Sequence, residues 1–216
     1  DVYKRQTLEK AIYGLYARND IVHPDGITGV IYKAGEQVAT LTTDKNGQAS
    51  VDGLYLGDYY VKEISPSVGY LADETEHDLV CNYEGDLVAE VKRDCTSLEQ
   101  VMKQPFQIIK AANNGKTDAD LLKGAGFTAY LESSLTKKAD GNYEFASATP
   151  VVIGENGATE MFTDEKGYAC SIALPYGTYI VRETTTPHNY TPVDDFTVRI
   201  TENNPNQPQT WRVLLD

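Results

Sequence analysis

The sequence predicts an all-β protein that folds as two tandem β-sandwiches. Short runs rich in β-branched and aromatic residues recur along the 216 residues, turn signals separate them, and no stretch shows a convincing helical period. The same series of motifs occurs twice, which indicates a tandem duplication of one domain. We expect the boundary near residue 103, with domains at 1–103 and 104–216.

The duplication is visible in two blocks of motifs. The turn Thr-Asp-Lys-Asn-Gly at 43–47 recurs as Thr-Asp-Glu-Lys-Gly at 163–167, and the strand-like run at 57–63 recurs at 177–183, both at an offset of 120 residues. The blocks that open the copies, 8–16 and 122–130, are related by an offset of 114 residues. The second copy therefore carries a net insertion of six residues between its blocks, the difference between these two offsets.

Each expected strand is a short apolar run bounded by turn residues. In the first copy we expect strands at 11–17, 30–33, 37–43, 48–51, 59–64, 77–83 and 86–92. In the second copy we expect them at 106–110, 126–131, 144–146, 158–163, 168–173, 178–184, 196–201 and 210–215. The turn at 43–47 predicts a hairpin, and so does Glu84-Gly85. Ser97–Lys103 remains unassigned.

A glutamate ends the apolar face of the repeated strand in both copies. Side chains alternate between the two faces of a strand, so Tyr179, Val181 and Glu183 share one face. In the first copy the same pattern ends at Glu63. An unpaired ionised carboxylate is too costly to keep in a core. Each glutamate is therefore expected to be neutral, paired, or at the wet end of its strand.

The first strand of the second copy adds a lysine to the same problem. Alternation groups Phe106, Ile108 and Lys110 on one face, so a lysine and Glu183 both point toward one core. Burial favours the neutral amine, which is a nucleophile, and the neutral carboxylic acid, which can shuttle a proton. An Asn or Asp side chain held against the amine would then give an intramolecular amide. The alternatives are a plain buried ion pair, or two side chains that reach solvent at the strand ends.

Three motifs, seen twice in the same order, resemble the Cna protein B-type or SpaA-like repeat domains of Gram-positive pilins and surface adhesins. They are the opening block (Leu122–Phe127 and Ala11–Tyr16), the Thr-Asp-x-x-Gly turn, and the strand Gly-x-Tyr-x-Val-(Lys/Arg)-Glu with the Pro-containing loop and Tyr that follow it. The resemblance covers essentially the whole chain after Gln6. It implies prealbumin-like, Ig-like β-sandwiches that serve as stalk or presentation modules.

The resemblance also implies a spontaneous isopeptide bond between the first and last strands of a domain. Carried over to the second copy, it makes Lys110 the amine donor, Glu183 the assisting acid and Asp216 the acceptor. Asn203 and Asn204 are fallback acceptors, although Pro205 and Pro208 suggest a loop there.

The first copy departs from this pattern. The 114-residue offset puts its lysine before residue 1, unless a shorter loop lets Lys4 serve, so we expect its first strand to be truncated or replaced. Glu99, eleven residues before Lys110, stands where the resemblance puts an acceptor. We expect no bond there, which leaves Glu63 as a relic or a hydrogen-bonding partner.

Composition limits the other functions. A net charge of −13 argues against nucleic-acid or anionic-membrane partners. The sequence contains no run of 18 or more apolar residues, so no membrane-spanning segment is expected. The three cysteines, at 81, 95 and 170, form no metal-binding spacing, and a Cys81–Cys95 bridge is possible but unsupported. Calcium binding through 113–120 is conceivable, but the EF-hand pattern is missing, so no metal or cofactor is expected.

Catalysis on an external substrate is not expected either. His23, His77 and His188 lack a nucleophile at recognisable spacing, so the chain is not expected to be an enzyme beyond autocatalytic amide formation. The expected role is structural, at the bacterial cell surface, with cell-wall anchoring through regions outside this fragment. The expected partners are neighbouring domains of the same surface protein. An adhesin module that binds a host matrix protein or glycan is the alternative, because the 15 tyrosines are good contact residues.

Overall fold

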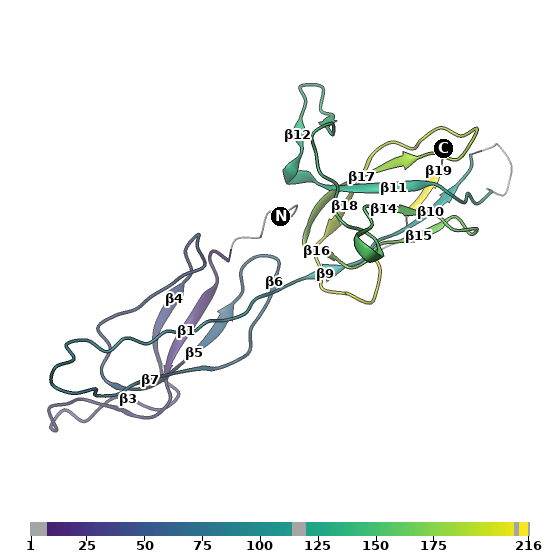
Figure 1. Ribbon diagram of the computed structural model, residues 1–216. Helices are drawn as coiled ribbons and strands as arrows, with labels where there is room; N and C mark the ends of the chain where they lie inside the picture. The colour runs from purple at the N-terminus through teal and green to yellow at the C-terminus, as the bar shows by residue number, and fades with distance from the viewer. Residues whose placement is uncertain (1–7, 114–119, 210–211, 216) are drawn as a thin grey trace. The chain divides into compact units, whose positions relative to one another are not determined.

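The computed structural model describes residues 8–113, 120–209 and 212–215 (Figure 1). The chain forms two compact units, Gln6–Gln100 and Val101–Asp216. The described residues hold β-strands and two single-turn 3-10 helices, η1 (Glu132–Ser134) and η2 (Glu155–Gly157). The predicted all-β class is therefore confirmed.

The first unit is built on one antiparallel sheet with the strand order β4-β1-β5-β7. Its strands are β1 (Ile12–Ala17), β4 (Gln37–Thr42), β5 (Gly57–Ser65) and β7 (His77–Cys81). Two short pairs join β2 (Ile21–Val22) to β3 (Val30–Tyr32) and β6 (Tyr70–Leu71) to β8 (Gln100–Val101). The core on the inner face of the sheet contains Leu15, Ala17, Ile21, Tyr59 and Val61.

Two strands expected in the first unit are absent. The segments 48–51 and 86–92 contain β-branched residues, yet neither is a strand in the structure. The side chains of 48–51 are all exposed, and those of 86–92 are exposed except at Val91. A strand is stabilised by a partner edge and a face to bury, and both segments lack these. The alternation of residue types was therefore misleading at these two places.

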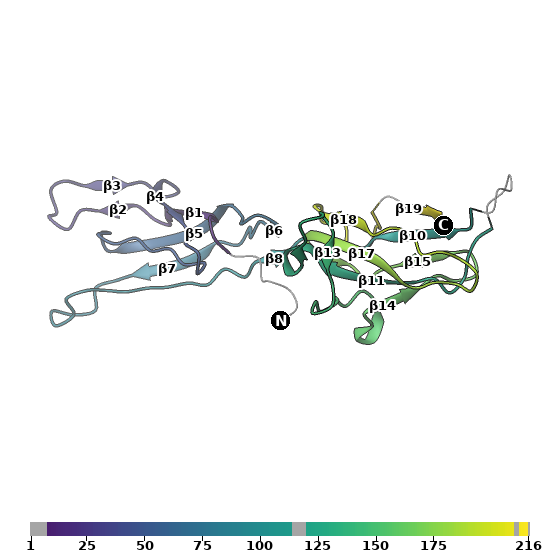
Figure 2. The ribbon, with the colours of Figure 1, turned by 90° about the horizontal axis from the view of Figure 1, so that it is seen from above.

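The second unit has two sheets, which Figure 2 shows as facing layers. One has the order β14-β11-β17-β18, made of β14 (Glu160–Phe162), β11 (Gly126–Leu131), β17 (Gly177–Thr185) and β18 (Phe196–Ile200). The other has the order β15-β10-β19, made of β15 (Tyr168–Cys170), β10 (Gln107–Ala111) and β19 (Arg212–Leu215). Between them lies a core that includes Phe106, Ile108, Phe127, Tyr179 and Val181, all fully buried. This is the predicted sandwich.

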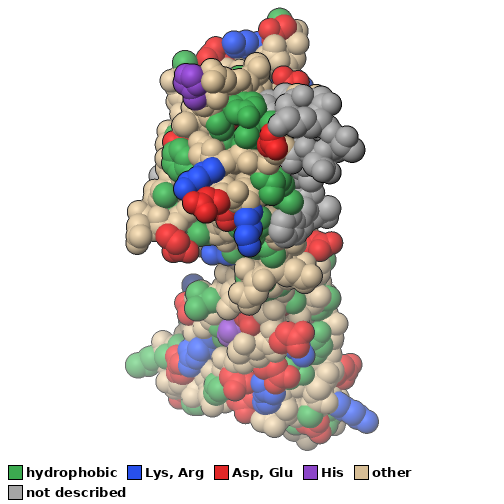
Figure 3. Space-filling model, turned by 90° about the vertical axis from the view of Figure 1, so that its right-hand side faces the viewer, with side chains coloured by type: hydrophobic (Ala, Val, Ile, Leu, Met, Phe, Trp, Pro, Cys, Tyr) green, Lys and Arg blue, Asp and Glu red, His purple; other side chains and the backbone are tan. Residues whose placement is uncertain are grey.

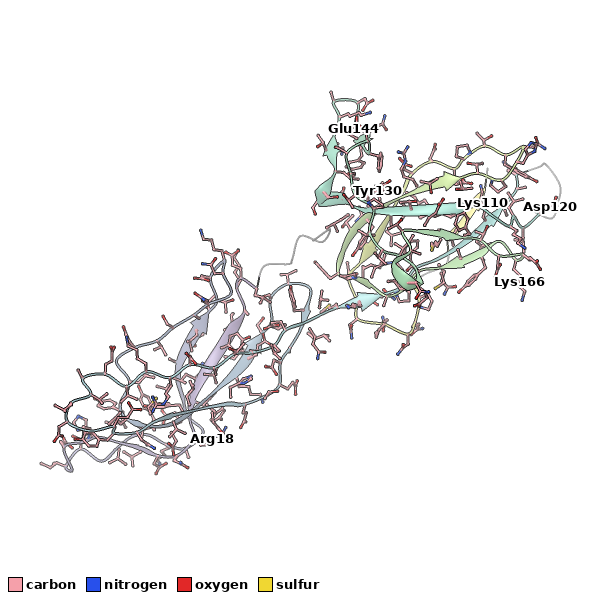
Figure 4. The ribbon with its side chains drawn as sticks, in the orientation of Figure 1. Arg18, Lys110, Asp120, Tyr130, Glu144 and Lys166 are labelled. Atoms are coloured by element: carbon pink, nitrogen blue, oxygen red, sulfur yellow. The ribbon has the colours of Figure 1, made fainter. Side chains whose placement is uncertain are left out.

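Two short strand pairs complete the second unit. β9 (Lys103–Gln104) pairs with β16 (Leu174–Pro175), and β12 (Thr136–Lys137) pairs with β13 (Tyr143–Glu144). The β12–β13 hairpin projects from the sandwich, with Glu144 on the hairpin and Tyr130 near its base (Figure 4). The hairpin lies between β11 and β14, the part of the chain to which the six-residue insertion was assigned.

The first and last strands of the second unit are neighbours and run in the same direction. β10 pairs with β19 in parallel, with Ile108 opposite Arg212 and Lys110 opposite Leu214. Parallel neighbours need a long connection, and here almost the whole unit provides it. The chain therefore enters the sandwich at one end of this strand pair and leaves at the other.

The repeated Thr-Asp-x-x-Gly turn has the same structure in both units. Asp164 Oδ1 accepts hydrogen bonds from the backbone N–H groups of Lys166 and Tyr168, and Asp44 accepts the corresponding pair in the first unit. The preceding threonine is buried. Thr163 Oγ1 donates to Leu122 O at 2.7 Å and accepts from Ala125 N at 3.0 Å. The hydroxyl thus ties the turn to the segment that leads into β11.

Replacing Thr163 by valine is expected to destabilise the second unit by about 2 kcal/mol. The shapes match, but the N–H of Ala125 and the carbonyl of Leu122 lose a buried partner, which typically costs roughly 1–3 kcal/mol. Urea unfolding measures the change. Thr136→Val, at an exposed position of β12, is the control and should change stability little. Equal effects from the two variants would contradict this role.

Candidate functional site

Lys110 lies in the middle of the β15-β10-β19 sheet and points into the core. Its side chain has no exposed surface. Its backbone N–H donates to Gly167 O at 2.7 Å, and its carbonyl accepts from Leu122 N at 3.0 Å. Figure 4 labels this lysine inside the second unit. Lys110 thus faces inward, the direction that its place in the strand alternation predicts.

Glu183 faces Lys110 from the opposite sheet. Its Oε2 lies 3.7 Å from Lys110 Nζ, and the side chains of both residues are 0% exposed. The same Oε2 accepts a 2.8 Å hydrogen bond from Val193 N, while Oε1 is buried with no hydrogen-bond partner among the described residues. Phe127 is the residue opposite Glu183 in the β11–β17 register. The structure thus brings together the two residues that the sequence singled out.

The environment of this pair matters for its chemistry. The two charges are enclosed by apolar side chains of the core, including Phe106, Ile108 and Phe127. Removing an ammonium and a carboxylate from water is expensive, and a pair with incomplete hydrogen bonding is weak evidence for stability. The interior of the protein keeps the amine and the acid in contact, out of water, in a fixed orientation. Such an arrangement suits a proton transfer between them.

The expected acceptors can be compared by position. Asp216 lies outside the described residues, and Leu214, two residues before it, is paired with Lys110. Asn203 Oδ1 accepts from the backbone N–H of Lys103 at 3.1 Å, and the N–H of Asn204 donates to Lys103 O at 2.9 Å. Lys103 is in β9, seven residues before Lys110, on the order of 20 Å along an extended chain. The two asparagines are therefore held beside β9, away from the lysine.

The equivalent glutamate of the first unit has a different neighbour. Glu63 is 7% exposed and accepts a hydrogen bond from Asp73 N, as Glu183 does from Val193 N. The residue beside it is not a lysine but Glu99, whose Oε1 accepts a 2.7 Å hydrogen bond from Tyr13 Oη. Burial, reinforced by the Glu99 carboxyl, raises the pKa of Glu63 to about 7. Lys4, the amine that the sequence offers for this unit, lies outside the described residues.

Sequence reasoning missed two parts of these sites. It did not anticipate that Gly167 packs against Lys110, although the repeated Gly at this turn was a signal. The contact between Tyr13 and Glu99 was not predicted either, because it joins residues that are 86 positions apart in the sequence. Elsewhere acidic and basic side chains are interspersed over the face in Figure 3, as expected for a solvated acidic surface.

The fold and the buried pair define the chain as tandem prealbumin-like β-sandwiches with a polar centre in the second core. The chain belongs to the SpaA prealbumin-like fold domain family, whose model matches it twice, at residues 1–94 and 105–212. The predicted family is thus confirmed. No curated protein sequence matches the chain.

One solved structure supports the fold. The Bacillus anthracis TIE protein superposes with a TM-score of 0.57 at 20% identity, covering 100% of this chain and 32% of that protein. The chain thus spans about a third of that protein's length. GBS52, a minor pilin of Streptococcus agalactiae, matches with a TM-score of 0.40 at 17% identity, covering 97% of this chain and 83% of that chain. The shaft pilin SpaA of Lactobacillus rhamnosus GG matches with a TM-score of 0.34 at 21% identity, covering 97% of this chain and 84% of that chain. Within the described residues, no helix has the length and apolar character needed to cross a bilayer.

Proposed function

We propose that this chain is part of the stalk of a Gram-positive cell-surface protein, and that an amide bond between Lys110 and Asp216 closes its second unit. The observation that carries the proposal is the fully buried contact between Lys110 and Glu183, beside the parallel pairing of β10 and β19. Family membership supports the stalk role. The proposed location is extracellular, and the proposed partners are neighbouring domains of the same surface protein. Direct adhesion to a host matrix protein or glycan stays a prediction.

The proposed reaction is a condensation in which Glu183 moves the protons. A proton passes from the Lys110 ammonium to Glu183, which leaves a neutral amine and a neutral acid in contact. Lys110 Nζ attacks Cγ of the protonated Asp216 carboxyl, while Glu183 donates its proton to the carbonyl oxygen. An N–C bond forms, a C–O bond breaks, and one water leaves. Fixed proximity can supply roughly 7–11 kcal/mol of the barrier.

A stalk module benefits from a bond at this position. The chain enters through β10 and leaves through β19, so tension on the ends pulls the two strands past each other and loads the bonds between them. Hydrogen bonds contribute only roughly 0.5–1.5 kcal/mol each and can all break under load, whereas an amide does not break thermally. A covalent bond would thus protect the sandwich against both force and proteolysis.

Intact mass spectrometry of the denatured chain tests the proposal. The chain is expected to be lighter than its sequence mass by one water, and Glu183→Gln is expected to have the full mass because its amide cannot take up the lysine proton. Glu165→Gln, a matched change at an exposed glutamate, should keep the loss of water. A full-mass parent chain that is correctly folded would contradict the bond. A loss of water that persists in Asp216→Ala would contradict the acceptor.

A further inference from the structure

A cluster of acidic groups in the first unit has no role in the proposed bond. Three side chains of this cluster lie in contact: Glu63 on β5, Tyr13 on β1, and Glu99 just before β8. Tyr13 Oη donates to Glu99 Oε1, and Tyr13 is opposite Glu63 in the β1–β5 register. One oxygen of each carboxyl, Glu63 Oε1 and Glu99 Oε2, is buried without a hydrogen-bond partner among the described residues.

The second unit differs from the first at the equivalent position. At the equivalent position Glu183 faces the ammonium of Lys110, and Phe127 replaces Tyr13. In the first unit the glutamate faces a second carboxyl instead. Two ionised carboxylates in contact repel each other, and no donor from the described part of the chain reaches these two oxygens to offset the repulsion. A single shared proton removes the repulsion and supplies the missing donor.

The same cluster attaches the end of the first unit to its sheet. The backbone N–H of Asp73 donates to Glu63 Oε2, while Asp73 Oδ2 accepts from Ser97 Oγ at 2.6 Å and lies 2.9 Å from His77 Nε2. Residues 97–99 are thus held at two points, through Ser97 to Asp73 and through Glu99 to Tyr13 and Glu63. The chain continues from here into β8, which pairs with β6.

We propose that Glu63 and Glu99 share one proton and form an acid-dependent clasp, which holds residues 97–99 on the first unit below neutral pH and loosens above it. In this clasp the proton is the ligand, and the carboxyl pair is its binding site. The proposal is independent of the bond in the second unit.

The direction of the effect follows from where the proton binds. Burial, then the Glu99 carboxyl, raises the pKa of Glu63 to about 7 from an ordinary 4.5. The folded state therefore binds the proton more tightly than the unfolded chain. The stabilising effect of the bound proton is complete below about pH 4.5 and is lost as the pH rises through about 7.

The other groups around the clasp behave differently. From β1, Tyr13 has a pKa raised well above its usual range, chiefly by burial, so it stays a donor. From the loop after β6, Asp73 has a pKa held far below its usual range by Ser97 and His77, so it stays ionised. His77, from β7, is the remaining titratable group in contact with this network and needs its own control. Ser97 does not titrate.

Hydrogen exchange of the whole chain, corrected for the intrinsic effect of pH, tests the clasp. Protection of the backbone amides at 97–101 is expected to fall roughly 50- to 100-fold between pH 5 and pH 8, since a pKa displaced from 4.5 to about 7 changes the equilibrium by that factor. Glu63→Gln, which removes the titrating carboxyl, should abolish the fall, and Glu99→Gln should reduce it, because burial alone still raises the pKa of Glu63. His77→Gln should keep it. The amides of β17 in the second unit provide an internal reference.

A carboxyl titration followed by NMR gives a readout that needs no variant. The Glu63 carboxyl is expected to titrate with a midpoint near 7, because it is buried beside a second carboxyl. A Glu63 midpoint near 4.5 would overturn the proposal. Protection that does not change with pH, or a fall that His77→Gln removes and Glu63→Gln does not, would overturn it as well.

Discussion

Replacing Lys110 by methionine is expected to lower the unfolding temperature of the second unit by about 20 °C or more. Methionine keeps the apolar volume of the buried stem but cannot form the proposed bond. An amide that closes a loop of about 100 residues restricts the unfolded chain by roughly 4–5 kcal/mol, if it acts as a disulfide of that span does. Each kcal/mol moves the midpoint of a domain of this size by about 4–8 °C. The buried Glu183 also loses its cation.

Differential scanning calorimetry of the whole chain measures this shift, with the first unit's transition as the reference. Lys123→Met is the matched control, because the Lys123 side chain is 66% exposed and its ion pair is with the exposed Glu165. Its effect should stay within a few degrees. A shift of only a few degrees for Lys110→Met as well would mean that the lysine contributes no more than an ordinary buried side chain.

Replacing Gly167 by alanine is expected to be the second most damaging change, with a loss of about 3 kcal/mol or more. Gly167 has a φ of +66°, and an added Cβ would lie 2.3 Å from the carbonyl oxygen of Lys110. A left-handed conformation costs a non-glycine residue roughly 1–2 kcal/mol. The clash adds to this because the obstacle is backbone, which moves only if β10 moves.

Gly124→Ala separates the two contributions. Gly124 has a φ of +84°, and a Cβ added there would meet no atom within 4 Å, so only the conformational cost applies. Urea unfolding of both variants should show a larger loss for Gly167→Ala, and its mass spectrum should show less of the water-loss product. Equal losses for the two variants would mean that the contact with Lys110 is unimportant.

The sequence predicted most of the framework because the strands repeat twice with clear alternation. The face that carries Tyr179, Val181 and Glu183 is buried as expected, and the corresponding face of β5 behaves alike. Lys110 and Glu183 could be paired before the structure was known because each ends an apolar stripe that has to point inward. Strand alternation alone was enough to predict that both side chains point into the core.

Strand alternation did not predict the features that depend on contacts with distant parts of the chain. The segment 86–92 has strand-like residues but no neighbouring edge, so its propensity was not realised. The contact between Tyr13 and Glu99 joins residues 86 positions apart, and only the packing of the loop before β8 creates it. The approach of Gly167 to Lys110 depends on how β15 lies against β10. Such distances are set by tertiary structure rather than by local sequence.

The proposed bond across the β10–β19 pair would also limit how far the second unit could lengthen under tension. If Lys110 is joined to Asp216, the 105 residues between them fall outside the line of tension, and on the order of 350 Å of contour length stays hidden however hard the ends are pulled. The first unit, where no such bond is expected, would unravel and lengthen first. Under tension the first unit would then be an extensible segment, linked in series with a second unit that does not extend.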